Sequence, residues 1–385
     1  MIKMVIAHEV GHALGLPHNM KASSAYPVDS MRSAAFTQEY GIAATIMDYA
    51  RFNYVAQPGD EGIRFIRKIG PYDHYSINWG YRWIPGMEGP ESEKEILDSW
   101  ILEKAGDPVY LFGSGRGGID PSAQTENIGD DPVKASKYGI KNLKIVSENL
   151  IEWTSQKGKD YSDLKELYAT LVRTWGMYSR HVLNNLGGVY QTQKTTDQDG
   201  LVYDYVPAKI QSSSLGFLNE HVFRTPEWLI NENILRRIEP SGEIKRISDI
   251  QKSMLNRLLD NERMLRMVEA ESFLDEESYS LQQMMHDLRK GIWGDLEHNF
   301  STDAYNRNLQ LAWIDRLSEF ITKPDDKDKK DSFINADISA LANNELNTIQ
   351  DSINLRKDRI RNPQARSHYM YCLKRIEDEL SQSSK

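Results

Sequence analysis

Residues 8–18 read HEVGHALGLPH, and this stretch decides how the rest of the chain is interpreted. Residues four apart on an α-helix lie on the same face, so His8 and His12 can direct their imidazoles at one metal ion. Glu9 lies beside the first of these histidines, within reach of a water molecule at the metal but not needed as a ligand itself. The spacing therefore predicts a helix that carries two metal ligands and a candidate general base.

The residues after His12 predict the end of this helix and the position of a third ligand. Gly15 can adopt a positive φ angle and end the helix sharply. The chain then turns, which lets His18 return toward the other two histidines. Three histidines and one water molecule form a tetrahedral zinc site with one open position, the arrangement of catalytic zinc centres. We therefore expect one catalytic zinc ion, held by His8, His12 and His18.

A methionine follows at a position where its side chain can form an apolar floor beneath such a site. Residues 45–49 read TIMDY, and Met47 comes 29 residues after His18. A thioether below the metal would give the imidazoles a soft apolar floor. Tyr49, two residues further on, can place its phenol near the open face of the metal. We expect Met47 to be structural at the site.

The composition narrows the classes of function. The 385 residues carry a net charge of −9, and 39% of them are hydrophobic, which predicts a folded chain. A length of 385 residues favours about two to three domains. A nucleic-acid-binding protein usually shows a basic excess or a basic stripe, and neither occurs here. No apolar run is long enough to predict a membrane-spanning helix. The single cysteine, Cys372, excludes an internal disulfide and a zinc site made of thiolates.

Helical patterns dominate the later two thirds of the chain. Pro132 follows two aspartates and predicts a helix start, with Asp at the cap and Pro in the first turn. Apolar residues at steps of three and four predict helices over 164–182, over 248–265 and over 309–320. Ser248 and Gln251 fit a capping box at the start of the second of these. Val-, Tyr- and Thr-rich runs on both sides of an Asp-Gly pair predict a β-hairpin near 189–206.

These patterns predict a mainly α protein with two parts. Residues 1–130 would carry the metal site, with the active-site helix, the methionine turn and irregular loops. Residues 131–385 would form a helical region that includes the small hairpin. A mixed-charge run with a proline at 323–331 predicts a solvated linker, followed by two more helical segments.

The histidine motif and the methionine together resemble the metzincin metalloproteases, whose pattern is HExxHxxGxxH followed by a methionine turn. Three further stretches resemble the met-zincin family of bacterial zinc-dependent metalloproteases. They lie at 44–60, 70–81 and 129–132 and read ATIMDYARFNYVAQPGD, GPYDHYSINWGY and GDDP. The resemblance is specific to about residue 150 and weaker in the helical remainder.

The resemblance implies both a fold and a chemistry. Residues 1–130 would be the lower catalytic subdomain of a metzincin, acting on a protein or peptide substrate. The residues that it carries over are three zinc ligands, a general base, a turn methionine, a helix-ending glycine and a catalytic tyrosine: His8, His12, His18, Glu9, Met47, Gly15 and Tyr49. It also implies an extracytoplasmic location for the full-length parent, whether periplasmic, cell-surface or secreted.

The sequence departs from the family pattern at its start. Metzincins place a small β-sheet subdomain before the active-site helix, and its edge strand binds the substrate backbone. Here seven residues precede His8, and they contain no export signal. We therefore expect Met1 to be an internal methionine of a longer protein, or the chain to come from a truncated gene. Apolar side chains of this segment would then lack their packing partner: Ile2, Met4, Val5 and Ile6.

The expected function is hydrolysis of peptide bonds by a zinc-activated water, with Glu9 as the general base. The alternative is a truncated or non-catalytic protein that binds zinc and acts through its helical region as an interaction module. Solvent access separates the two, because a fourth protein ligand would close the site whereas an open position serves catalysis. His74, the nearest other histidine in the sequence, has no ligand spacing.

Overall fold

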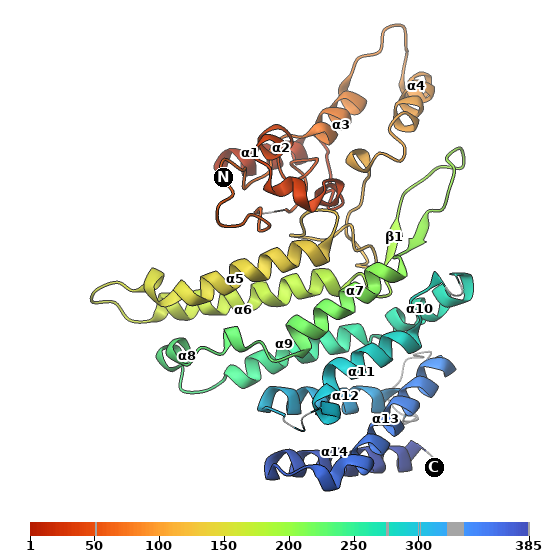
Figure 1. Cartoon of the computed structure of the whole chain (residues 1–385). Helices are drawn as coiled ribbons and strands as arrows, with labels where there is room; N and C mark the ends of the chain where they lie inside the picture. Colours follow the sequence, from red (N-terminus) through yellow and green to blue (C-terminus); the bar gives the residue numbers. More distant parts are fainter. Residues whose placement is uncertain (51, 275–276, 299, 301, 322–334, 384–385) are drawn as a thin grey trace, which may run out of the picture. The chain divides into compact units, whose positions relative to one another are not determined.

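The computed structural model describes residues 1–50, 52–274, 277–298, 300, 302–321 and 335–383 (Figure 1). Within these residues the protein is mainly α-helical with one two-stranded antiparallel hairpin, which confirms the predicted fold class. The linker predicted at 323–331 lies outside the described residues. No helix in the described part of the chain is both long and apolar enough to cross a membrane.

Contacts between residues divide the chain into two units. The first comprises Met1–Ile145 and Gly188–Tyr205, and the second comprises Val146–Gly187 and Val206–Lys385. The boundary lies inside helix α5 (Pro132–Thr154), beyond the division at residue 130 that the sequence predicts. The hairpin groups with the first unit, whereas the sequence placed it with the helical region.

The first unit is built from short helices joined by long irregular segments. Its helices before α5 are α1 (Ile2–Ala13), α2 (Ala34–Tyr40), α3 (Pro71–Tyr81) and α4 (Pro90–Leu102). Single turns of 3₁₀ helix occur at Ala22–Ala25, Val28–Arg32 and Pro108–Tyr110. The apolar core comes mostly from the segments between helices: Ala22, Tyr26, Val28, Met31, Ile42, Ala43, Ala44, Ala50, Val55, Ile128 and Ala135. Residues on both sides of Met47, at 42–44 and at 50, are therefore part of the core.

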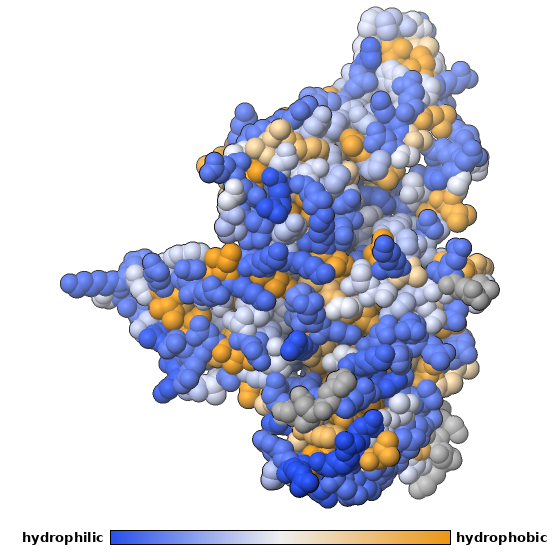
Figure 2. Space-filling model, in the orientation of Figure 1, coloured by the Kyte–Doolittle hydropathy of each residue, from blue (hydrophilic) through white to orange (hydrophobic). Residues whose placement is uncertain are grey.

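Helix α1 buries only a small part of its surface. His8 and Gly11 are its buried residues. Its apolar side chains are largely exposed, as expected from the sequence, with exposed fractions of 77% for Ile2 and 57% for Ile6. Figure 2 shows apolar surface beside the N-terminus of the chain.

The hairpin has shorter strands and a longer connection than the sequence predicts. Strand β1 (Val189–Gln191) pairs with β2 (Tyr203–Tyr205), and Tyr190 lies opposite Asp204. The intervening residues do not continue the ladder beyond the hydrogen bond from the Thr192 N–H to the Val202 carbonyl. Instead, Thr195 and Gln198 form a turn of their own, because each backbone N–H finds an acceptor on the other residue.

The second unit is a set of packed helices. Beyond the end of α5 they are α6 (Ser162–Leu183), α7 (Ala208–Leu218), α8 (Glu232–Ile238), α9 (Glu243–Leu258), α10 (Asn261–Leu274), α11 (Leu281–His298), α12 (Ala304–Ile321), α13 (Ala336–Arg356) and α14 (Pro363–Ser383). A turn of π-helix extends α7 at Asn219–Phe223, and short 3₁₀ turns lie at Glu227–Leu229 and Lys357–Arg359. Helix α12 packs against α9, α13 and α14. Trp293 and Trp313 meet edge to face in the interior, with ring centroids 5.7 Å apart.

Two features of these helices differ from what the sequence predicts. The apolar stripe over 164–182 is buried in α6 except for Leu167, which is 47% exposed. Helix α9 begins at Glu243, five residues before Ser248, where a capping box was predicted. Gln251, the other member of that box, is buried and donates from its amide to the Val222 carbonyl at 2.8 Å. A capping-box pattern inside a longer helix therefore arose from two inward-facing polar side chains.

Candidate metal centre

Helix α1 ends in a turn that reverses the chain between His12 and His18. The N–H of Gly15 donates to the His12 carbonyl at 2.9 Å, and the N–H of Leu16 donates to the Gly11 carbonyl at 3.0 Å. This pair of hydrogen bonds is the Schellman motif that ends many helices. Gly15 has a φ of 83°, which is strained for any residue with a Cβ. Glycine at this position therefore lets His18 return to the helix it has just left.

The three histidines of the motif converge on one point. The Nε2 atom of His18 lies 3.2 Å from Nε2 of His8 and 3.0 Å from Nε2 of His12. Two nitrogen ligands at about 2.0–2.1 Å from a tetrahedral zinc ion are about 3.3–3.4 Å apart. The observed separations are close to this value, so the three side chains fit a single zinc ion.

Backbone carbonyls orient two of these imidazoles. His8 Nδ1 lies 2.8 Å from the Ile46 carbonyl oxygen, and His12 Nδ1 lies 2.9 Å from the Leu16 carbonyl oxygen. A carbonyl can only accept, so each Nδ1 carries the proton and each Nε2 of the neutral ring presents a lone pair. Two lone pairs thus point toward Nε2 of His18, which as a donor could satisfy only one of them. A cation at their centre accommodates all three nitrogens, which is the second sign that the residues fit a metal.

Met47 forms the floor beneath α1. Its side chain is 1% exposed and contacts the helix at Gly11, between the two histidines of that helix. A Cβ at Gly11 would lie 2.3 Å from the Met47 sulfur, so no larger residue fits without displacing the thioether. The methionine therefore packs against α1 at Gly11, which lies between His8 and His12 in the chain.

Tyr49 and Glu9 lie near the histidines and are partly or fully exposed. The Tyr49 ring centroid is 4.3 Å from that of His18 and 5.5 Å from that of His8, and the tyrosine is partly exposed. Glu9 is exposed on α1 beside His8, which is itself buried. Both side chains are therefore at least partly accessible to solvent.

Burial and nearby charges favour the neutral form of His18, which is the form that binds a metal. Burial lowers its pKa below the usual value, and the nearby His12, His8 and Arg67 lower it further. The negative charge of Glu9 acts in the opposite direction. A lowered pKa means that the imidazole stays neutral, with a free lone pair, over more of the range below pH 7.

Asp73, at the start of α3, holds the methionine turn in place. Its carboxylate is buried and accepts hydrogen bonds from the Ile46 N–H at 2.9 Å, the Gly70 N–H at 2.7 Å and the Thr45 hydroxyl. The Thr45 hydroxyl oxygen in turn accepts from the Met47 N–H at 3.0 Å. One carboxylate therefore fixes the peptide groups on either side of the residue that orients His8.

Asp48, which follows Met47, links the methionine turn to a second segment of the chain. It is fully buried and accepts from the Ser23 N–H at 2.7 Å and the Ala50 N–H at 2.6 Å. Burial raises the pKa of this carboxyl to about 7, against the opposing effect of these backbone donors. Asp48 thus joins the turn to the segment that follows the third histidine.

The segment after His18 also forms hydrogen bonds to residues 111–113. The Asn19 amide donates to the Leu111 carbonyl at 2.9 Å, and its oxygen accepts from the Gly113 N–H at 3.0 Å. The Met20 N–H donates to the Gly113 carbonyl at 2.7 Å. Residues 111–113 are therefore fixed next to the third histidine.

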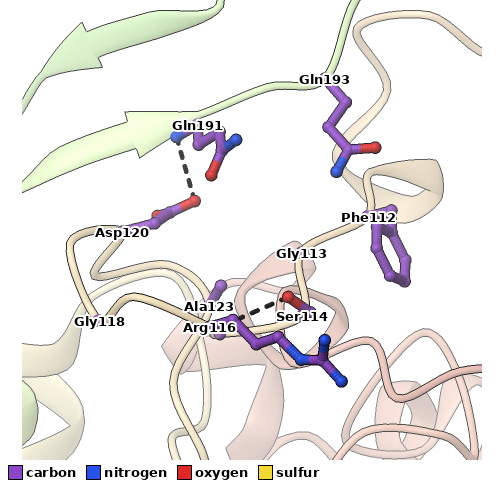
Figure 3. A pocket seen from close by; sticks show the side chains of 10 residues that line it. Phe112, Gly113, Ser114, Arg116, Gly118, Asp120, Ala123, Gln191 and Gln193 are labelled. Carbon is purple, nitrogen blue, oxygen red and sulfur yellow. Dashed lines mark hydrogen bonds between the residues drawn. The ribbon is translucent and has the colours of Figure 1, made fainter.

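A small polar pocket adjoins this stretch (Figure 3). Phe112 and Gln193 lie at one end, and Asp120 lies at the other, where it accepts from the Gln191 N–H at 3.1 Å. Beside the pocket, the buried Lys21 ammonium pairs with Asp120 at 2.9 Å and donates to the Gln191 carbonyl at 2.8 Å. This buried ion pair ties the hairpin to the chain just beyond the third histidine.

The structure gathers most of the predicted site residues around one point: His8, His12, His18, Met47 and Tyr49. Glu9 lies at the rim, and Gly15 makes the turn. Among the described residues, the three histidines are the one group of three or more His, Cys, Asp or Glu side chains that could hold a metal ion, and their ligand atoms lie within 4.8 Å of one another. His74 is exposed on α3 and outside this group.

Sequence reasoning missed two residues of the site. Gly11 carried a signal, because glycine inside a helix costs about 1 kcal/mol relative to alanine and often marks a close contact. Asp73 carried none that local pattern could reveal, because the Ile46 and Thr45 groups that it binds lie 27 and 28 residues earlier in the chain.

Comparison with known proteins gives one match. No curated protein and no solved structure matches the chain. A sequence model of the family described as Met-zincin matches residues 1–299 of the 385, which includes every residue of the histidine cluster and its floor. Because the match covers well over half of the chain, the protein belongs to the Met-zincin family, a metzincin-type family of zinc metalloproteases.

Proposed function

We propose that this chain is a zinc-dependent endopeptidase, with His8, His12 and His18 as the ligands and Glu9 as the general base. The observation that carries the proposal is the convergence of the three Nε2 atoms, at separations of 3.0 and 3.2 Å from His18. The absence of a fourth His, Cys, Asp or Glu ligand among the described residues supports an open position rather than a closed structural site.

Zinc and Glu9 would have separate roles in hydrolysis. Zinc in this position would polarise the scissile carbonyl and lower the pKa of a water molecule toward about 7. Glu9 would accept the proton of the attacking water at its carboxylate and then deliver it to the leaving amine. Its exposed place beside His8 supports this role, because both water and the scissile bond must reach it.

Tyr49 and Met47 would act on either side of the ligands. The Tyr49 hydroxyl would donate a hydrogen bond to the carbonyl oxygen as negative charge develops there. The proximity of its ring to the rings of His8 and His18 supports this position. Met47 would exclude water from below the ligands, since its side chain is buried against α1.

A Glu9→Gln variant tests the function. Glutamine keeps the shape of the side chain but cannot take up the proton, so cleavage of an unfolded generic protein should fall by about 10²–10⁴-fold. Zinc content should stay equal to that of the parent chain. The matched control is Glu88→Gln, which changes another exposed glutamate outside the histidine cluster and should leave both cleavage and zinc unchanged.

Each result has a clear meaning. Cleavage by the parent and the Glu88 variant but not by the Glu9 variant would support a protease with Glu9 as its base. Equal cleavage by all three proteins would refute that assignment. One bound zinc without cleavage by any of them would favour the alternative, a non-catalytic zinc-binding protein.

A further inference from the structure

The carbonyl that orients His8 also accepts a second hydrogen bond. The Ile46 oxygen lies 2.8 Å from His8 Nδ1 and 2.9 Å from Nη1 of Arg67. A carbonyl oxygen has two lone pairs, so both donors can bind at once. The guanidinium and the imidazole are therefore joined through one acceptor atom.

Both charged groups around Ile46 are buried. Arg67 is 5% exposed and binds the carbonyl of Ile46, and Asp73 is 4% exposed and binds its N–H. A buried charge is costly unless its hydrogen-bonding capacity is used. Here a cation and an anion hold the two peptide groups of one residue, the residue directly before Met47.

We infer that Arg67 is a positioning residue that acts on the metal centre through the Ile46 carbonyl and His8. The inference rests on the proposed function, since it takes His8 as a zinc ligand. Arg67 holds the carbonyl in the direction that the Nδ1–H of His8 requires. The lone pair on Nε2 of His8 then stays directed at the point shared with His12 and His18.

The alternative role for Arg67 is general support of the fold, and the effect of Arg67 on metal binding distinguishes the two roles. A purely structural arginine would affect folding alone. A positioning arginine also determines how tightly and in what geometry the metal is held, as outer hydrogen-bonding partners of metal ligands do.

The test compares four proteins by metal binding rather than by turnover. They are the parent chain, Arg67→Met, Arg67→Lys and the control Arg263→Met. Arg263 is a matched control because it is also buried, at 9% exposure, and donates to a backbone carbonyl, that of Arg257, at 2.9 Å. It lies on α10 in the second unit, whereas the three histidines belong to the first.

Zinc affinity is measured by competition with a coloured chelator, and geometry by the visible spectrum of the cobalt(II)-loaded protein. Arg67→Met should weaken zinc binding by about 10-fold, at the lower end of the usual effect of outer partners, and should shift the cobalt bands. Arg67→Lys keeps a cationic donor for the same carbonyl, so most of the affinity and the parent spectrum should return. Arg263→Met should lower the melting temperature but leave zinc affinity and spectrum unchanged.

The outcomes separate this inference from the proposed function. A parent chain that binds no zinc would refute the proposed function and, with it, the inference. A parent that binds zinc together with an Arg67→Met variant of equal affinity and spectrum would overturn the inference alone. Equal losses of affinity in the Arg67 and Arg263 variants would do the same. If Arg67→Met does not fold, Arg67→Gln replaces it, and it should bind zinc more weakly than Arg67→Lys.

Discussion

Replacing Gly11 by alanine should displace the floor of the metal centre. An added Cβ would lie 2.3 Å from the sulfur of Met47 and 3.3 Å from its terminal methyl carbon. Atoms in contact normally lie about 3.5–4.0 Å apart, so the new methyl group and the sulfur must separate by roughly 1.2 Å or more. Met47 is 1% exposed, so the thioether can move only by disturbing the packed residues around it.

The magnitude follows from two opposing terms. Overpacking of this kind costs about 1–3 kcal/mol. Alanine in place of glycine inside a helix returns up to about 1 kcal/mol. The expected net loss is therefore up to about 2 kcal/mol, which corresponds to a fall in Tm of up to roughly 8 °C for a unit of this size. Calorimetry in the presence of a chelator measures this fall without a contribution from bound metal.

Gly80→Ala is the control for this experiment. Gly80 also lies in a helix, α3 of the same unit, but nothing lies within 4 Å of its added Cβ. This variant should therefore melt at the same temperature as the parent or slightly higher. If Gly11→Ala melts like Gly80→Ala, the close contact between α1 and Met47 does not exist and the reasoning fails.

Three further predictions address the helix turn, the metal and a buried histidine. Gly15→Ala should cost about 1–2 kcal/mol in urea unfolding through its φ of 83° alone, because nothing lies near its added Cβ; an unchanged midpoint would contradict the turn. A chelator should lower the Tm of the zinc-loaded parent, since zinc at 1,000 times its Kd stabilises by about 4 kcal/mol, but should leave His18→Ala unaffected; equal responses would refute the ligand assignment. Burial, with a smaller effect of Arg307, lowers the pKa of His368 to about 4. Its unfolded value is about 6.5, so its stabilising contribution is complete above about pH 6.5 and is lost as the pH falls toward 4, by up to about 3 kcal/mol. His368→Gln should flatten this slope in urea titrations between pH 4 and 7, and an unchanged slope would exclude the histidine as its source.

The sequence predicted the features whose cause lies within a few residues. The spacing of His8 and His12 places both on one helix face. Gly15 ends that helix in a turn closed by two backbone hydrogen bonds. The Val- and Tyr-rich runs predicted the hairpin, and the apolar periodicity predicted the helices that follow Pro132. Local backbone preference and side-chain periodicity are sufficient for these features, because each involves neighbours along the chain.

Where local pattern was the only guide, it also misplaced details. The hairpin strands are three residues long because the connecting segment forms its own turn around Thr195. The capping box predicted at Ser248 is instead a polar pair on a buried helix face, and α9 begins before it, at Glu243. In the first case one local turn replaced another, and in the second a contact with the distant Val222 carbonyl holds the buried Gln251.

The support of the metal centre was decided by tertiary structure alone. His8 is oriented by the carbonyl of Ile46, which is 38 residues away in the chain. Lys21 binds the carbonyl of Gln191, 170 residues away. Gly11 leaves the space that Met47 occupies. A sequence motif can specify which atoms bind a metal, because helix geometry is repetitive and local. The groups that aim those atoms come from whichever segments pack beside them, and that packing exists only in the folded unit.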